Sequence, residues 1–440
     1  MKSIVLSTVF SWLSRLCAII LNLVGIPLAL AKLGPSRFGL LLVVLSIGSW
    51  IGFANIGTGR LIANVVARRR KAASRFTIEM ISFATVLAAA FNLLLFVAAT
   101  TLFILAMHFI TANEAIAANY HEFFISVVTL FFAMALWFFL SIFEGIDAGH
   151  HQLHRLYIFQ VCSYLVSLTV LLLLFPARPS IWLAAALLNL GFLLGSLAHA
   201  ADVVRRNSHL FSLNFVWSRR IARLLLLSSI DFTIINLGLG VMFQLAPGLF
   251  GFVYGPESVL ELGIFIRLMQ SYGAIVISFT YPLSNVLASR LKARENESAL
   301  HTGRISLLLL IAGGGLAGCI FFATGDVVLS FWLRTSVELD RLFRLGASLL
   351  ITITALHLLF SALLVAASEI RRAAYIHLGE AVAYPPLAYI FFWLYGQSGI
   401  LLAMDLVFGA GVLVMVTKLR GHAVLSQLFR VSRSPKGLAQ

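Results

Sequence analysis

The chain has 440 residues, of which 60% are hydrophobic and 11% charged, and its mean hydropathy is +0.99. Soluble domains carry about 25% charged residues, so this composition excludes a soluble globular protein. The formal net charge is +15, which on its own is compatible with nucleic-acid binding. The positions of the charges along the chain indicate a membrane protein instead.

Apolar stretches of about 20 residues recur along the sequence, and a helix of this length crosses the ~30 Å hydrocarbon core of a bilayer. Backbone polar groups in lipid must pair within their own segment, so runs this long predict helices rather than barrel strands. We predict twelve transmembrane helices, at residues 4–31, 39–64, 78–106, 123–143, 157–175, 181–201, 224–247, 258–283, 304–324, 343–366, 375–395 and 399–417.

The Lys and Arg residues are distributed unevenly between the two sides that these helices define. If the N-terminus is cytoplasmic, most of the 32 Lys and Arg residues lie in cytoplasmic segments. The opposite side carries only Lys32, Arg37, Arg178, Arg334, Arg341 and Arg344. This asymmetry follows the positive-inside rule. The sequence therefore predicts that both termini are cytoplasmic, and we expect no nucleic-acid partner.

Two pairs of short motifs recur at a spacing close to half the chain length. Residues 33–36 (LGPS) precede the second predicted helix, and residues 254–257 (YGPE) precede the eighth. Residues 154–157 (HRLY) and 372–375 (RAAY) likewise precede the fifth and eleventh. Six helices return the chain to its starting side, so the halves are predicted to be parallel repeats. Transporters built from such repeats place the substrate between two lobes.

The repeat divides the chain into four predicted parts. Residues 1–205 form an N-terminal six-helix lobe, and residues 224–417 form a C-terminal six-helix lobe. Residues 206–223 form a cytoplasmic connector, in which aromatic residues beside arginines predict a helix in the membrane interface. Residues 418–440 form a basic cytoplasmic tail. We expect this tail to contact membrane lipids.

Several ionisable side chains lie inside the predicted helices: Arg15, Arg60, Asp231, Glu261, Arg267, Glu380 and Asp405. A charge at mid-bilayer costs roughly 2.5–3.5 kcal/mol on insertion scales, so such groups generally face a cavity or one another. Guanidinium groups match phosphate oxygens in geometry and charge. We therefore predict that Arg15, Arg60 and Arg267 hold a diphosphate in a cavity. The alternative is that they form structural ion pairs with Asp231 and Glu261, or that Arg60 snorkels to the interface.

The carboxylates Asp231, Glu261, Glu380 and Asp405 are predicted to couple an ion or to compensate the arginines. Burial disfavours the charged form of a carboxylate, so such a group can exchange a proton or hold Na⁺. Paired prolines follow Glu380 at residues 385–386, where they interrupt the helical hydrogen-bond ladder and expose carbonyl groups.

Glu144, Asp147, His151 and His154 follow the fourth predicted helix at spacings that could share one helical face. The sequence contains no dense metal motif such as His-Glu-x-x-His, so we expect solvated histidines here and no metal site. A Gly-rich phosphate loop and a Gly-x-Ser-x-Gly motif are also absent. We therefore expect no cofactor and no enzymatic activity.

The motifs near the first two predicted helices resemble those of polysaccharide-transport flippases of the Wzx type. Leu33, Gly34 and Gly39 match the Leu-Gly-x-x-x-x-Gly turn of that family, and Asn55 replaces the usual acid of the element that follows. Further matches are Glu144-Gly145, residues 149–152, Asp231, Gly255-Pro256 and Phe331-Trp332-Leu333. The family belongs to the superfamily that also contains multidrug extrusion pumps.

This resemblance implies a MATE-like transporter of twelve helices in two lobes, located in the bacterial cytoplasmic (inner) membrane. Its substrate would be an undecaprenyl-diphosphate-linked oligosaccharide, the repeat unit of a surface polysaccharide, moved by alternating access. Relatives that flip the peptidoglycan precursor carry cavity arginines in helices one, two and eight, where Arg15, Arg60 and Arg267 lie here. The resemblance also implies partners in the same pathway, a glycan polymerase and glycosyltransferases.

Two other functions are compatible with the sequence. A cation or drug antiporter of the same superfamily would need an acidic, aromatic cavity. Three arginines against Asp231, Glu261 and Asp405 give a rough balance of charge instead. A membrane-embedded glycan polymerase or ligase would need a large outer loop, and the longest predicted one, residues 325–342, is short.

Overall fold

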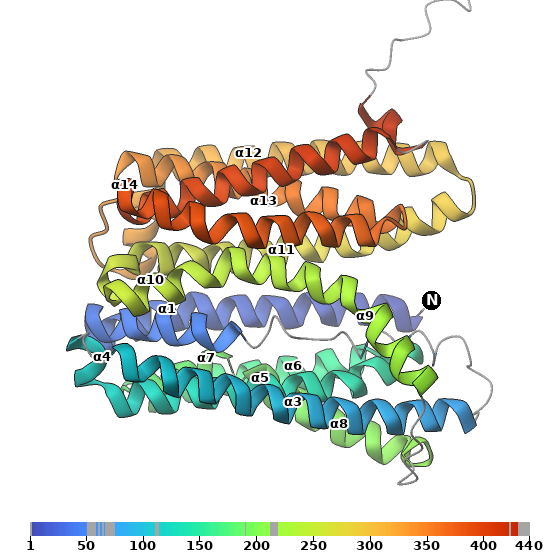
Figure 1. Ribbon diagram of the computed structural model, residues 1–440, viewed down its shortest axis with the longest axis horizontal. Helices are drawn as coiled ribbons and strands as arrows, with labels where there is room; N and C mark the ends of the chain where they lie inside the picture. The colour runs from blue at the N-terminus through green and yellow to red at the C-terminus, as the bar shows by residue number, and fades with distance from the viewer. Residues whose placement is uncertain are drawn as a thin grey trace, which may run out of the picture.

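The computed structural model describes residues 2–50, 59, 62–63, 66, 75–110, 114–189, 191–211, 219–421 and 424–429. All regular elements in these ranges are helices, and the long ones run side by side in one bundle (Figure 1). Nine of the described helices are long and apolar enough to cross a membrane, and the bent pair α7–α8 makes a tenth. The chain is therefore an all-α multi-pass membrane protein, while the count of twelve spans stays a prediction.

The helices of the two halves of the chain gather on opposite sides of the bundle (Figure 1). The first half contains α1 (Lys2–Trp50), α3 (Arg75–Ile110), α4 (Glu114–Ala118), α5 (Tyr120–Gly149), α6 (His154–Leu174), α7 (Ile181–Asn189), α8 (Gly191–Arg206) and the 3₁₀ helix η2 (Ser208–Leu210). The second half contains α9 (Arg219–Gly240), the π-helical η3 (Val241–Leu245), α10 (Ala246–Tyr254), η4 (Pro256–Val259), α11 (Leu260–Lys292), α12 (Asn296–Leu333), α13 (Arg341–Ala366), α14 (Ile370–Arg420) and η5 (Leu425–Phe429).

Helices α1 and α14 each contain one glycine whose backbone is not helical. Gly34 has φ 75° and ψ 167°, and Gly396 has φ 59° and ψ −143°. Glycine reaches such positive φ values without the steric cost that a Cβ would impose. Each glycine lies between two of the predicted transmembrane helices. Figure 1 shows α1 as two arms that run in opposite directions on either side of this break.

Two predicted boundaries differ from the structure. Helix α5 continues to Gly149, so Glu144 and Asp147 lie inside it. The prediction that these two residues follow the helix is wrong. Helix α9 begins at Arg219, within the predicted connector 206–223. Residues 212–218 of the connector and 430–440 of the tail lie outside the described part of the chain.

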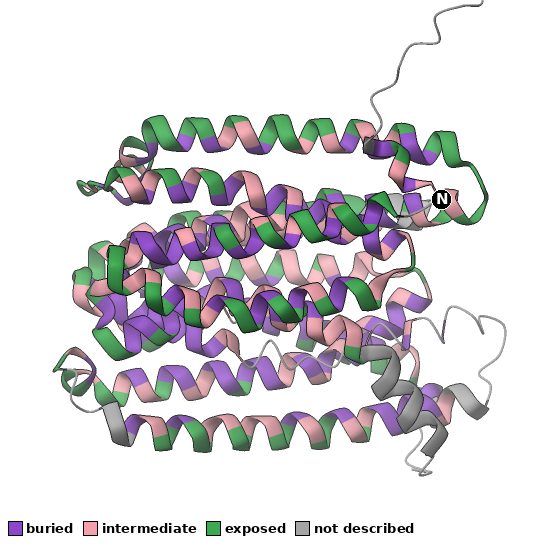
Figure 2. Cartoon of the chain, turned by 45° about the horizontal axis from the view of Figure 1, so that its top comes forward, coloured by how far each residue is buried: buried purple, intermediate pink, exposed green. Residues whose placement is uncertain are grey.

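The outer helices expose apolar side chains to their surroundings, as a bilayer requires. Leu173, Leu308 and Val327 are examples, and Phe331 is 86% exposed. Buried residues concentrate on the inward faces and in the central helices, while the outermost helices carry long exposed stretches (Figure 2). Lipid is as apolar as these side chains, so this exposure is stable in a membrane although it would be a liability in water.

The second arm of α1 packs the two halves of the chain against each other near the Gly34 break. A Cβ added to Gly39 would lie 2.8 Å from the Cβ atom of Pro256, which shows how closely the backbones approach. The indole of Trp50 donates a hydrogen bond to the carbonyl oxygen of Gln244 at 3.1 Å. One apolar core contains residues from both halves, such as Leu41 and Phe252. The halves are therefore in tight contact at this end of the bundle.

Candidate functional site between the lobes

Arg15 lies on the first arm of α1 and reaches across to α11, in the other half of the chain. Its guanidinium donates a hydrogen bond to the Ala274 carbonyl oxygen at 3.1 Å and another to the Ser278 hydroxyl. None of the ion pairs in the described residues includes Arg15. Its charge is therefore balanced by polar groups alone.

Arg267 is a buried cation on α11 that also has no acidic partner among the described residues. The residue is only 8% exposed, and its Nη1 atom donates to the Gln270 side-chain oxygen at 3.0 Å. Its Nη2 atom is buried and has no hydrogen-bond partner in the described structure. An unpaired buried donor of this kind is costly for the fold, so the position is predisposed to bind an anion.

Arg267 and the Ala274 carbonyl group that Arg15 contacts lie on the same face of α11. Arg267 and Ala274 are seven residues apart, about two helical turns, so they share one face at levels separated by about 10 Å. Gly263, one turn before Arg267, packs against α1, because an added Cβ would lie 2.8 Å from the Leu42 side chain. Arg267 therefore lies on the side of α11 that faces α1. Arg60, the third predicted arginine, lies outside the described residues.

A cavity of about 790 Å³ opens beside this interface at the end near Gly34. It is lined by residues of α1, α6, α11 and the end of α12 with the loop that follows, among them Leu23, Pro27, Glu261, Ile264, Trp332 and Arg334. The indole of Trp332 donates to the Leu23 carbonyl oxygen at 2.8 Å and so joins the two halves at the cavity wall. Ile264 precedes Arg267 by about one helical turn of α11, and Arg267 itself is not among the lining residues.

Two of the predicted carboxylates have partners other than the interface arginines. The Glu261 carboxylate accepts a hydrogen bond from the Gln397 side chain of α14. Asp231 lies 3.9 Å from the Nε atom of Arg371, a side chain that is 73% exposed, so this contact is weak. The described structure therefore does not contain the alternative pairing of Arg15 and Arg267 with these two acids.

Asp405 lies on the second arm of α14 and is only 8% exposed. Neither of its carboxylate oxygens has a hydrogen-bond partner among the described residues. On α13, a Cβ added to Gly346 would lie 3.6 Å from the Asp405 Oδ2 atom. Because a buried carboxylate without partners is energetically unfavourable, a bound cation or proton would stabilise Asp405.

Glu380 lies on the first arm of α14 between two buried histidines. Its Oε1 atom is 2.7 Å from His357 Nε2 of α13, and its Oε2 atom is 3.0 Å from His377 Nδ1. The sequence reading missed both histidines. The spacing of three residues between His377 and Glu380 places them on one face of a helix and could have identified this pair. The sequence holds no such signal for His357, which lies on another helix.

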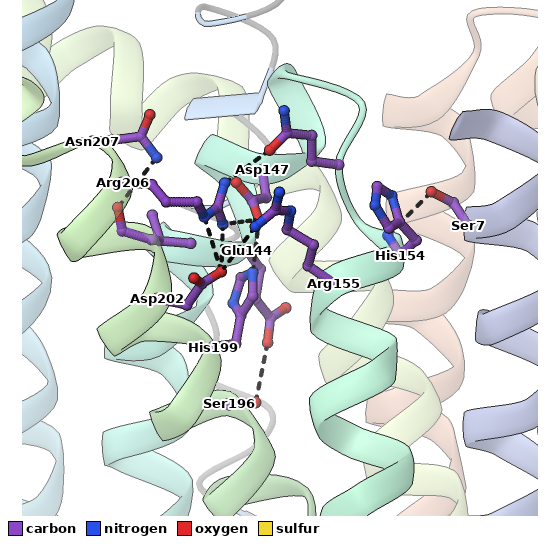
Figure 3. A network of polar contacts seen from close by, with 12 residues as sticks. Ser7, Glu144, Asp147, His154, Arg155, Ser196, His199, Asp202, Arg206 and Asn207 are labelled. Carbon is purple, nitrogen blue, oxygen red and sulfur yellow. Dashed lines mark hydrogen bonds and ion pairs between the residues drawn. The ribbon is translucent and has the colours of Figure 1, made fainter. Parts of the chain in front are cut away.

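A second polar network ties α5 to α8 in the first half of the chain (Figure 3). Asp147 is fully buried, and its Oδ2 atom lies 3.0 Å from His199 Nε2 and 2.8 Å from Arg206 Nη2. Arg206 also contacts Asp202 at 2.9 Å. Of the histidines that we expected to be solvated, His151 is exposed and His154 is partly exposed. Charge neutralisation inside the lobe explains this network without a ligand.

No protein-family model matches the sequence, and no curated protein matches it. Several solved structures have the same fold. An inward-facing multidrug resistance MATE family transporter of the MOP superfamily is 16% identical, with a TM-score of 0.70 over 94% of this chain and 96% of that one. The eukaryotic MATE transporter AtDTX14 is 14% identical, with a TM-score of 0.68 over 97% of each chain.

A MOP superfamily transporter from Pyrococcus furiosus, described as having a binding pocket of reverse polarity, is 14% identical with a TM-score of 0.66. It covers 98% of this chain and 97% of that one. Identities this low show the fold and not the substrate. The chain therefore has the fold that is seen in these MATE transporters of the MOP superfamily.

Proposed function

We propose that the protein is a flippase that moves an undecaprenyl-diphosphate-linked oligosaccharide across the bacterial cytoplasmic membrane by alternating access. The observation that carries this proposal is the pair Arg15 and Arg267. Both lie at the contact between α1 and α11, and neither has an acidic partner among the described residues. A cationic interlobe site matches a diphosphate better than a cationic drug.

The chemistry of the two side chains fits a diphosphate. A guanidinium group is permanently charged and donates two parallel hydrogen bonds to phosphate oxygens. The spare donor of Arg267 is buried, where a charge-assisted hydrogen bond is strong because water does not compete. The two guanidinium groups meet α11 at levels about 10 Å apart. They could bind the diphosphate and the first sugar at the same time, or bind the diphosphate one after the other as it moves.

The surface around Arg15 also suits a lipid-linked substrate. Trp12, Leu13 and Leu16 on the same arm of α1 are exposed, although Arg15 reaches inward to α11. A polyprenyl tail could therefore remain in the bilayer along this apolar surface while the diphosphate enters between the lobes. The membrane potential could drive such a step, since moving one charge through 100 mV is worth about 2.3 kcal/mol. Asp405 is the candidate for a coupling ion, because it is buried without a partner among the described residues.

The second candidate function is a cation or drug antiporter. Similarity to multidrug MATE transporters favours it, and so do Glu261 at the interlobe cavity and the unpaired Asp405. A glycan polymerase or ligase has less support, because the loop between α12 and α13 is short. The glycan polymerase and glycosyltransferases of the pathway are proposed partners of the flippase, together with membrane lipids.

Deleting the gene in its host tests the proposal. The flippase function requires loss of surface polysaccharide, with the lipid-linked oligosaccharide trapped in the cytoplasmic leaflet. Plasmid-borne wild type and Arg290→Ala, a variant on the same helix α11 but away from the interface, should restore the polysaccharide. The double variant Arg15→Ala/Arg267→Ala should not. Normal polysaccharide together with new sensitivity to cationic drugs would favour the antiporter instead.

A further inference from the structure

The second half of the chain contains a cluster of metal-ligating side chains that the transport proposal does not use. His357 lies on α13, while His377 and Glu380 lie on the first arm of α14. Their ligand atoms all lie within 4.8 Å of one another, and no other group of three or more His, Cys, Asp or Glu does so in the described part of the chain. We propose that these three residues bind one transition-metal cation of the zinc class.

The cluster has the ligand types and spacing that zinc requires. Zinc is commonly held by two His and one Glu, with the fourth position open, at about 2.0–2.2 Å from each nitrogen and oxygen. Tetrahedral ligand atoms are then separated by about 3.3–3.6 Å. The present distances from the Glu380 oxygens to His357 Nε2 and His377 Nδ1 are 2.7 and 3.0 Å. Small side-chain movements would therefore admit the ion.

The orientation of His377 supports a metal ligand rather than a simple hydrogen bond. Its Nδ1 atom and the Glu380 Oε2 atom are 3.0 Å apart, yet neither has an aligned hydrogen-bond partner in the described structure. Both atoms are therefore available as ligands for one ion placed between them. The other ring nitrogen, Nε2, lies 3.1 Å from the Ser361 hydroxyl. A contact of this kind fixes the ring and its tautomer in many metal sites.

The charge balance also favours a bound cation. Glu380 is 4% exposed and the two histidines are fully buried. No Lys or Arg forms an ion pair with Glu380 among the described residues, whereas the comparable carboxylate of Asp147 is neutralised by Arg206. The His357 ring is a hydrogen-bond partner of Glu380 Oε1, whereas Oε2 has none in the described structure. A buried carboxylate is unfavourable unless it is paired, protonated or bound to a metal. Two imidazole nitrogens and one carboxylate oxygen are a ligand set that binds a divalent cation of the zinc class.

The cluster borders a groove between the two arms of α14. The groove has a volume of about 590 Å³, and Glu380 is among its lining residues. Gly411 leaves room for the carboxylate, because a Cβ at this position would overlap Glu380 Oε1. Arg372 and Lys418 also line the groove, at the ends of the two arms. These cations should slow the entry of a divalent ion, so metal must be equilibrated for hours.

The test uses the purified full-length protein, stripped with a chelator, equilibrated with Zn²⁺ alone and dialysed before metal analysis. We expect about one zinc ion per chain for the wild type, as a three-ligand site would hold. His357→Gln and Glu380→Gln should weaken binding more than about 100-fold, and Ser361→Ala about 10- to 100-fold. His199→Gln is the matched control, because it alters the other buried His–carboxylate contact, and it should bind zinc like the wild type.

Thermal unfolding with and without Zn²⁺ separates loss of the site from loss of the fold. Zinc should raise the unfolding temperature of the wild type and of His199→Gln, but not that of Glu380→Gln. A wild-type protein that retains no zinc and gains no stability from it would overturn the proposal, whatever the variants do. Equal zinc binding by the wild type and Glu380→Gln would overturn it as well. Neither result depends on the transported substrate.

Discussion

Arg15 on α1 donates a hydrogen bond to the hydroxyl of Ser278 on α11, 263 positions further along the chain. This bond joins the two halves of the protein. Arg15 is the only charged residue between Lys2 and Lys32 in the first transmembrane helix. The bond to Ser278 gives Arg15 two possible roles, as a ligand for a phosphate or as a tie between the halves. The two roles predict different mutant behaviour.

Removing each partner separately distinguishes these roles. Arg15→Ala should weaken binding of the diphosphate-linked substrate about 10- to 100-fold, as expected for loss of one or more charge-assisted hydrogen bonds. Ser278→Ala should leave binding unchanged or strengthen it, because it frees a guanidinium donor. Titration of each purified variant with a fluorescent undecaprenyl-diphosphate saccharide measures this. Equal losses in both variants would mean that Arg15 acts as a structural tie.

Arg267 is expected to lower the stability of the fold although transport requires it. Its buried Nη2 atom has no hydrogen-bond partner in the described structure, so Arg267→Met should raise the free energy of unfolding by about 1–3 kcal/mol while it abolishes transport. Thermal unfolding in detergent measures the first effect, and Arg290→Met on the same helix provides the control. A destabilised Arg267→Met protein would indicate that the guanidinium has partners within the fold.

The contact between Gly39 and Pro256 should depend on the absence of a side chain. Gly39→Ala would place a Cβ 2.8 Å from the proline ring and 3.0 Å from its carbonyl oxygen, so we expect a destabilisation of about 1–3 kcal/mol. Gly273→Ala on α11 is the matched control. Nothing lies within 4 Å of the added Cβ there, and alanine should stabilise the helix by about 0.5–1 kcal/mol. If both variants lose the same stability, the interlobe contact is looser than the structure indicates.

The Asp147 network should stabilise the first half of the chain. Asp147→Asn would leave Arg206 with the partly exposed Asp202 as its only charged partner and His199 with a neutral one, so we expect a loss of about 2–3 kcal/mol, near the lower end for a broken buried pair. Asp202→Asn changes the half-exposed partner of the same arginine and should cost about 0–1 kcal/mol. Thermal unfolding of the two isosteric variants measures the difference. Equal effects would contradict the assignment of Asp147 as the central residue.

Sequence alone predicted those features that composition and local backbone chemistry determine. The apolar stretches became long helices, and the predicted boundaries after residues 31 and 395 fall near the non-helical Gly34 and Gly396. Both kinds of feature follow from residues that are close together in the chain.

The partners of the buried charges could not be predicted, because they come from distant segments. Asp147 meets Arg206 59 positions away, and Glu380 meets His357 23 positions away on another helix. A single sequence carries no signal for such contacts. Composition also cannot show which buried charged groups have no hydrogen-bond partner. In the described structure these include both carboxylate oxygens of Asp405 and one nitrogen of Arg267.

Transport of the substrate by the purified protein in vesicles tests the central claim most directly. Proteoliposomes would carry an undecaprenyl-diphosphate-linked oligosaccharide labelled on its sugar, and a membrane-impermeant glycosidase would report the fraction in the exposed leaflet. The account predicts that the wild type moves the labelled sugar between leaflets and that Arg15→Ala/Arg267→Ala does not. Movement of a cationic dye by the wild type, with no movement of the lipid-linked sugar, would contradict it.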